Sequence, residues 1–182
     1  NVGDEIEIKP GLMNEKKKSY EPILTEITSL GTAAGIVESV KPGGLVAIGT
    51  KLDPSMTRSD SFIGSVIGKP GTLPDNSTLL KLDVNLFDSA VGSTVDSTED
   101  LQVKPIQTGE LLRLNIGTAP VLGKVTKVKS SNVEIELRRP ACIFENGHVA
   151  ISRRIAERWR LIGAGIVGWS NLWHQFFNSF SN

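Results

Sequence analysis

The stretch from Val133 to Gly165, which reads VEIELRRPACIFENGHVAISRRIAERWRLIGAG, decides the fold of this chain. Apolar residues alternate with glutamates from Val133 to Leu137, and a period of two residues is typical of a strand with one buried face. Pro140 has no amide to donate to a strand ladder, so we expect it to end this strand or to lie at a sheet edge. Asn146 and Gly147 follow, and these residue types favour a tight turn. The stretch therefore opens with a strand and a turn.

Two more strands are predicted before the stretch ends. One alternates from Val149 to Ile155, and the other runs around 159–162 and closes on Gly163 and Gly165. Strands that follow one another through short turns in this way indicate a β-meander.

The same stretch is rich in arginine. Arginine presents a planar fork of donors that suits phosphate, whereas a solvated surface is as easily made with lysine. Alternation places Arg154, and not Arg153, on the same face as Ser152, so at most about half of the arginines can point one way. We expect the others to pair with Glu145 or Glu157, or to pack on the neighbouring tryptophan. The six arginines are Arg138, Arg139, Arg153, Arg154, Arg158 and Arg160.

Four segments in order resemble one known family. Ala150–Gly165, AISRRIAERWRLIGAG, resembles the end of the gamma subunit of archaeal and eukaryotic translation initiation factor two, which is an elongation-factor-Tu-like GTPase. The other three are VGDEIEIKPG (Val2–Gly11), KPGGLVAIGTKLDPSMTRSD (Lys41–Asp60) and TGELLRLNIGTA (Thr108–Ala119). Four ordered segments are more specific than a lone short motif. The resemblance extends from Val2 to Gly165.

The expected fold is all-β. Short alternating runs punctuated by glycine and proline, with almost no helical period, favour strands throughout. The resemblance implies two consecutive barrels, of the types of the second and third domains of elongation factor Tu. We expect the first barrel at 1–74, without its N-terminal strands, and the second at 75–165. The segment Gly68–Pro74, GKPGTLP, has the composition of a linker between them.

The tail at 166–182 differs from the rest. Its apolar residues recur at spacings of three and four, which predicts a short C-terminal helix. The family usually stops shortly after the WRLIG segment, so this tail departs from its pattern. The helix could fold back on the barrel or dock a partner, or the tail could be a non-native translation of an altered reading frame.

The composition is that of an ordinary globular protein, with 39% hydrophobic and 22% charged residues. Cys142 is the one cysteine, which excludes an internal disulfide, and its apolar neighbours predict a buried thiol.

The sequence has neither a signal peptide nor an uncharged run of membrane-spanning length, so we expect a cytoplasmic protein without a membrane partner. Asn1 is not a start methionine and the chain begins almost on a strand, so we expect a piece of a longer protein.

The net charge of the chain is zero, but its two halves carry opposite net charges. Residues 1–103 hold 9 Lys and Arg against 15 Asp and Glu, whereas residues 104–182 hold 11 against 5. An acidic half joined to a basic half favours two surfaces with different partners.

The sequence shows no residue pattern that is typical of a catalytic site. The sequence contains no CxxC, HExxH or GxSxG, and its two histidines lie in unrelated contexts. The GKPGT segment is not a phosphate loop, because its spacing is wrong and Pro70 removes an amide. We therefore expect neither catalytic residues nor a metal or cofactor site in this chain. The resemblance places GTP and Mg in an upstream domain, so whether the whole protein is an enzyme stays open here.

Two binding surfaces are predicted. The resemblance implies that the first barrel holds the alpha subunit of the factor, and we place this contact on Asp53, Arg58 and Asp60. A carboxylate such as that of Asp60 can accept charge-assisted hydrogen bonds from a partner, although it could equally cap its own turn. The second surface would face the phosphates of tRNA or ribosomal RNA. Its residues are Arg138, Arg139, Arg154, Arg158 and Arg160.

The predicted function is translation initiation. The family binds initiator methionyl-tRNA and delivers it to the small ribosomal subunit. The resemblance also implies a second partner, the beta subunit of the factor, which would bind the missing upstream domain. Two alternatives remain: a stand-alone β-barrel adaptor that binds protein without RNA, and a fragment of a selenocysteine-specific elongation factor.

Overall fold

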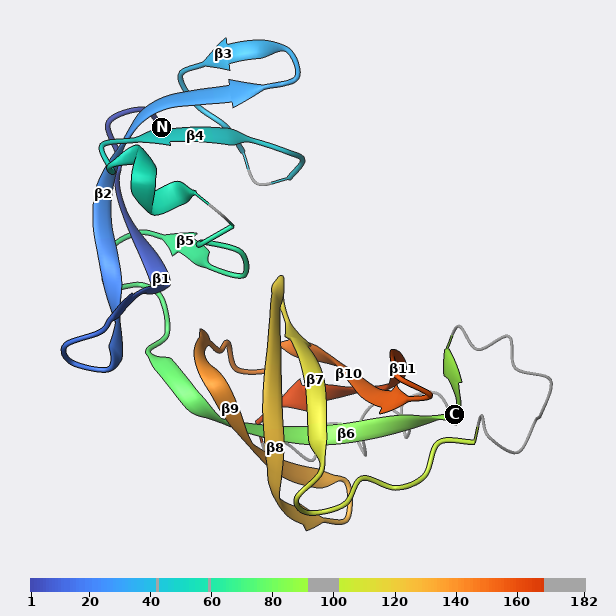
Figure 1. The fold of residues 1–182 in the computed structure, drawn as a ribbon. Coiled ribbons are helices and arrows are strands. Elements are labelled where there is room, and N and C mark those ends of the chain that lie inside the picture. Colours follow the sequence, from blue (N-terminus) through green and yellow to red (C-terminus); the bar gives the residue numbers. More distant parts are fainter. Residues whose placement is uncertain (42, 59, 92–101, 169–182) are drawn as a thin grey trace, which may run out of the picture. The chain divides into compact units, whose positions relative to one another are not determined.

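The computed structural model describes residues 1–41, 43–58, 60–91 and 102–168. These residues form strands and one short 3-10 helix, which confirms the all-β prediction (Figure 1). The chain divides into two units, Asn1–Asn76 and Ser77 onward. The division falls at the start of strand β6, whereas the sequence placed the boundary at Pro74. None of the described residues forms a helix long and apolar enough to cross a membrane.

The described residues of unit 1 form a five-stranded sheet. The order is β3-β2-β1-β5, and β4 also pairs with β2. The elements are β1 (Glu5–Asn14), β2 (Ser19–Thr32), β3 (Gly35–Val37), β4 (Ala47–Thr50), the 3-10 helix η1 (Pro54–Thr57) and β5 (Val66–Gly68). The β1–β2 hairpin carries the charged tip at 15–18, where Lys17 pairs with Glu21 at 2.6 Å.

β1 continues through Pro10 and Gly11, although these two residue types favour a turn. Its pairing with β2 shifts register between Ile8 and Leu12 and then continues to Asn14. Gly11 makes this possible, because it lies at φ +84° and a Cβ there would come within 1.8 Å of the Glu21 carbonyl oxygen.

Both faces of the middle of β1 are buried, although its charged residues alternate with isoleucines as in a half-solvated strand. Glu7 and Lys9 are as buried as the neighbouring Ile6 and Ile8. The segment after β5 covers them: the amide of Gly71 donates to Glu7 Oε2 at 3.1 Å, and Lys9 Nζ donates to the Leu73 carbonyl at 3.2 Å. Lys9 also lies 3.7 Å from Glu7 Oε1. The two buried charges therefore satisfy each other and the backbone above them.

The apolar run at Leu45–Ile48 is not a core strand. Leu45 is 93% exposed, and β4 begins only at Ala47. The next strand, β5, is likewise short and spans only Val66–Gly68. The buried cluster of unit 1 is correspondingly small, with Ile6, Ile27 and Leu30 at its centre.

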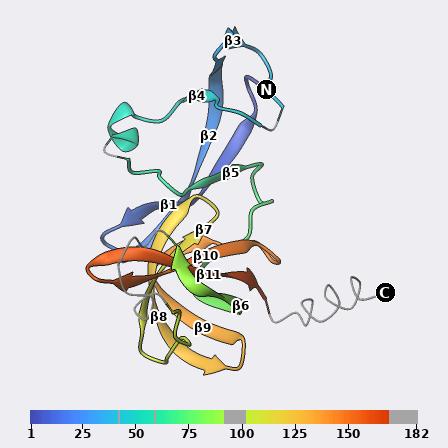
Figure 2. The same ribbon diagram turned by 90° about the vertical axis from the view of Figure 1, so that its right-hand side faces the viewer.

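Unit 2 is a closed six-stranded barrel of order β10-β11-β6-β9-β8-β7 (Figures 1 and 2). Its strands are β6 (Asn76–Val91), β7 (Leu111–Ile116), β8 (Ala119–Lys129), β9 (Asn132–Cys142), β10 (His148–Ile155) and β11 (Arg158–Val167). Closure gives every strand of this barrel a neighbour on both sides over at least part of its length.

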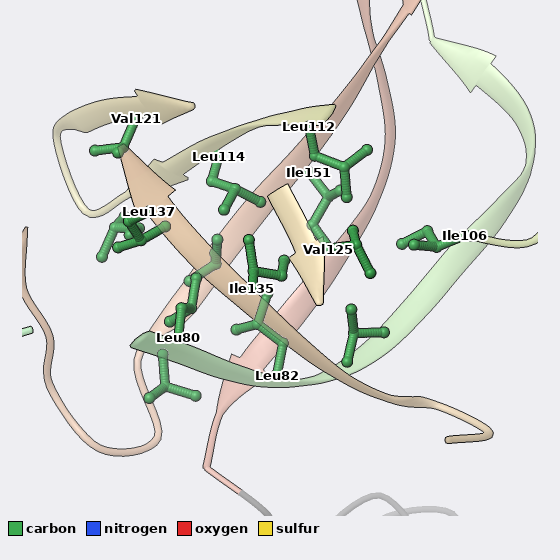
Figure 3. Packing of buried hydrophobic residues seen from close by; sticks show 14 of the residues in the cluster. Leu80, Leu82, Ile106, Leu112, Leu114, Val121, Val125, Ile135, Leu137 and Ile151 are labelled. Carbon is green, nitrogen blue, oxygen red and sulfur yellow. The ribbon is translucent and has the colours of Figure 1, made fainter. Parts of the chain in front are cut away.

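The barrel interior is filled by the residues that alternation marked as apolar. Leu112, Leu114, Ile135 and Ile151 are fully buried, and Figure 3 shows their side chains meeting inside the barrel. β7 has the predicted bounds, and Val133, Ile135 and Leu137 share the buried face of β9 as expected.

β9 continues through Pro140 to Cys142, and its pairing with β8 ends at Leu137, so Pro140 lies where β9 no longer has β8 beside it, as the second alternative for Pro140 allowed. The predicted end of the last strand is wrong. β11 continues through its glycines to Val167, so Ile166 belongs to the barrel and not to the tail. Residues 169–182, where the C-terminal helix was predicted, lie outside the described residues.

Candidate protein and nucleic-acid interfaces

Asp53 shapes the loop that follows β4. It stands at the N-cap of η1, and its Oδ1 accepts a hydrogen bond from the amide of Ser55 at 2.7 Å. Hydrogen bonds from the side chain and from the amide of Ser55 lower the pKa of the Asp53 carboxyl below its ordinary value of 3.8. The carboxylate of Asp53 is therefore used within the loop.

Asp60 lies further along the same loop and differs from Asp53. It is exposed and takes a left-handed backbone conformation, with φ 58°, and its carbonyl accepts from the amide of Ile63 at 3.0 Å. Its carboxylate has no hydrogen bond or ion pair to another described residue. Arg58 is also exposed, and its carbonyl accepts from the amide of Ser61 at 3.3 Å. This loop thus leaves one carboxylate, Asp60, available to a partner.

Arg153 links two segments within unit 2 through its side-chain contacts. It contacts Glu110 through Nε at 2.5 Å and through Nη2 at 3.1 Å, and both side chains are largely buried. Its Nη1 also donates to the carbonyl of Lys104 at 2.7 Å. Alternation correctly kept Arg153 off the face of Ser152, and these contacts tie the segment before β7 to β10.

The β10–β11 hairpin carries Arg154, Arg158 and Arg160. Arg154 pairs with Glu157 at the tip, although it was predicted to face RNA and another arginine was expected to pair with this glutamate. Ala156 and Glu157 form the two-residue turn, with φ 46° and 64°. Arg158 is exposed and Arg160 is half-buried.

Arg138 and Arg139 belong to β9, away from this hairpin in the strand order. Both are exposed, and Arg139 Nη2 donates to the carbonyl of Pro120 at 3.1 Å. β6 lies between β9 and β11, while β8 and β7 lie between β9 and β10, so about 10 Å and 14 Å separate the backbones at ordinary strand spacing. The predicted arginines therefore lie on strands that are not adjacent in the barrel.

Two of the three lysines of β8 add little to either set of arginines, because glutamates of β9 oppose them. Lys124 pairs across the strands with Glu136, and Lys127 with Glu134. The Lys127 and Glu134 charges lie 3.8 Å apart. Opposite charges facing each other across a ladder cancel most of the local field.

Within the described ranges, no three histidine, cysteine, aspartate or glutamate side chains come together as a metal site would require. Cys142 is buried, as predicted from its neighbours.

The family described as "Initiation factor eIF2 gamma, C terminal" matches residues 78–167, which are the closed barrel. Proteins named "Translation initiation factor 2 subunit gamma" match more of the chain. Those of Archaeoglobus fulgidus and Pyrococcus furiosus are 47% and 49% identical over 166 and 168 residues, and that of Aeropyrum pernix is 47% identical over 169. Each match covers 91% of this chain.

The chain belongs to the C-terminal region of the initiation factor two gamma family. It spans 38–40% of the length of these relatives. All five arginines that the sequence analysis assigned to RNA lie within the family region, whereas Asp53, Arg58 and Asp60 precede it.

One basic residue of the family region was missed. Arg113 stands in β7 between two fully buried leucines, so its side chain points outward. The alternation of the LLRLNI segment already indicated this direction. Its neighbours could not be predicted, because they depend on how β7 pairs with β8 and β10.

Proposed function

We propose that this chain is the C-terminal part of a translation initiation factor two gamma subunit and acts in translation initiation. The match with gamma subunits over 91% of the chain carries this proposal. The agreement between the family region 78–167 and the closed barrel supports it. The chain spans only 38–40% of these relatives, so GTP-dependent delivery of initiator methionyl-tRNA to the small ribosomal subunit is proposed for the longer protein.

Unit 1 is proposed to dock the alpha subunit through the loop that holds Asp53, Arg58 and Asp60. Asp53 would keep the loop in shape through its bond to Ser55, while Asp60 would accept hydrogen bonds from the partner. The exposed, unbonded carboxylate of Asp60 within the described loop supports this division of roles.

Unit 2 is proposed to contact the phosphates of tRNA or ribosomal RNA. The proposed contacts are Arg138, Arg139, Arg154, Arg158 and Arg160, and the charge of Arg154 is partly matched by Glu157. The beta subunit, GTP and Mg are assigned to the part of the longer protein that precedes these residues, and the location is proposed to be cytoplasmic.

Calorimetry with the alpha subunit of the same organism tests the docking role. The carboxylate of Asp60 would lose charge-assisted hydrogen bonds in Asp60→Ala, so we expect the affinity to fall at least tenfold, or about 1.4 kcal/mol. Asp88→Ala is the matched control, since Asp88 is an exposed aspartate of unit 2. Equal affinity of Asp60→Ala and wild type would rule out Asp60 as the contact, and no binding by wild type would rule out the docking role of unit 1.

RNA binding separates the proposal from an adaptor that binds only protein. A gamma subunit fragment should bind RNA with a strong salt dependence, because each neutralised phosphate releases counterions. An adaptor should bind the alpha subunit or another protein and show no affinity for RNA at low salt.

A further inference from the structure

We propose that Arg113 and Arg138 form a phosphate-binding track on the outer face of the unit 2 barrel. The outer track, as we call it, consists of Arg138 on β9, Leu122 on β8, Arg113 on β7 and Ser152 on β10. It rests on the proposed RNA contact of unit 2 and identifies the residues that carry it, with Arg113 at the centre.

The direction of both arginines follows from their strand neighbours. Leu112 and Leu114 are 0% exposed, so Arg113 between them must face out of the barrel. Leu137 is 4% exposed and precedes Arg138, which is itself exposed. Neither guanidinium group therefore takes part in the barrel core.

The strand register sets the neighbours of Arg113 and its spacing from Arg138. Arg113 pairs with Leu122 on one side and with Ser152 on the other. Leu137 pairs with Gly123 in the last pair of the β8–β9 ladder, and Arg138 follows Leu137 directly at the end of that ladder. Arg138 and Arg113 therefore stand on strands separated by β8, about 10 Å apart at ordinary strand spacing.

The track carries uncompensated positive charge. Its two other members are an apolar and a hydroxyl side chain, and the nearest glutamate of β9, Glu136, already faces Lys124. Within the described ranges neither Arg113 nor Arg138 has an ion pair or a hydrogen bond. Arg153 and Arg154, by contrast, are each matched by a glutamate.

These features suit a polymer of phosphates better than a single small anion. The outer face of a barrel is convex, so it does not close around one ion, and two separate guanidinium groups can each hold a different phosphate. The hydroxyl of Ser152 adds a donor of the kind that contacts nucleic-acid backbones. We choose RNA and not an acidic protein as the ligand, because the proposed function of unit 2 is to contact RNA. The experiment also measures the binding of polyglutamate, which stands for an acidic protein.

The test compares salt titrations of RNA binding by the full chain. Arg113→Gln with Arg138→Gln is measured against wild type by the anisotropy of a fluorescein-labelled RNA stem-loop and of initiator tRNA. Lys127→Gln with Lys129→Gln is the matched control, since it removes the same charge from the same unit. We expect the arginine variant to flatten the slope of log affinity against log salt by about 1.5 and the lysine variant to leave it nearly unchanged. Circular dichroism and the thermal midpoint should stay at wild-type values, because both arginines lie on the surface.

Three other outcomes would each contradict the proposed outer track. If wild type binds RNA and the arginine variant keeps the wild-type slope, the track is wrong while the RNA contact of unit 2 stands. If wild type binds no RNA at low salt, the proposed RNA contact fails and the track fails with it. If polyglutamate binds as tightly as RNA and with the same dependence on Arg113 and Arg138, the surface serves an acidic protein instead.

Discussion

At the scale of single residues, Gly163 shows how a glycine inside a strand allows a close approach of backbones. A Cβ there would lie 2.5 Å from the carbonyl oxygen of Asn85 and 3.0 Å from the Cα of Leu86. Both atoms belong to the backbone of β6, which pairs with β11 at this point. The clash therefore cannot be relieved by turning a side chain.

We expect Gly163→Ala to lower the free energy of unfolding of unit 2 by about 1–3 kcal/mol, because β6 and β11 must move apart. Urea unfolding followed by circular dichroism measures the change. Gly31→Ala is the control, since its Cβ would meet only the Ala47 Cβ at an ordinary 3.5 Å. An alanine at 163 that costs no more than the one at 31 would contradict the close packing of β6 on β11.

A second residue-scale prediction concerns acid. The hydrogen bond from Ser55 stabilises the charged form of Asp53 and so lowers its pKa. The stabilisation is complete above the ordinary value of 3.8 and is lost as the pH falls through the lower pKa of the folded state. The turn at η1 should therefore loosen only in acid.

The amide resonance of Ser55 reports this bond directly. In an NMR titration we expect its chemical shift to change with a midpoint below 3.8. In Asp53→Asn the pH dependence should vanish, because an amide oxygen can accept the same bond without titrating. A midpoint at or above 3.8 would show that the cap does not form.

At the scale of elements, the β10–β11 turn is built from residues that do not favour it. Its two central residues have φ of 46° and 64°, a conformation in which asparagine and glycine are preferred. Ala156 and Glu157 occupy it instead, which costs stability at each position.

We expect Ala156→Asn with Glu157→Gly to raise the free energy of unfolding of unit 2 by about 1 kcal/mol, because the new residues adopt positive φ without strain. Urea unfolding measures the gain. The control is Glu157→Gln, which removes the charge opposite Arg154 but keeps a side chain at the position. A double variant no more stable than the control would mean that the turn is not strained.

The strands of unit 2 could be predicted because their sequence alternates and their interior is filled by the alternating residues. β7 and the buried face of β9 followed directly from this period. The ends of β9 and β11 could not be predicted, because Pro140 is tolerated where β8 no longer pairs and Gly163 is required by the approach of β6. Both facts belong to neighbouring strands and not to the local sequence.

The candidate sites were predicted unevenly for the same reason. The sequence separated Arg153 from the face of Ser152, since that depends only on alternation. It did not show that Glu110, distant in the chain, holds Arg153, nor that Arg113 stands between Leu122 and Ser152. Such neighbours are set by strand register, which is a property of the folded sheet.

At the scale of the whole molecule, the two units differ in what holds them together. Unit 2 has a large buried cluster inside a closed barrel, while the buried cluster described in unit 1 centres on Ile6, Ile27 and Leu30. Unit 1 relies also on the buried charges of Glu7 and Lys9 and their bonds to the segment before β6. Separate cores of unequal size favour separate unfolding steps.

We therefore expect calorimetry to show two thermal transitions, with unit 1 melting first. Lys9→Met should lower only the first transition, because it leaves Glu7 buried without its cation, at a cost of about 3 kcal/mol. Gly163→Ala should lower only the second, since its clash lies between strands of the barrel. A domain of this size loses roughly 4–8 °C per kcal/mol, so both shifts are large enough to measure. One transition that moves with either variant would mean that the units unfold together, and the small core of unit 1 would then not limit its stability.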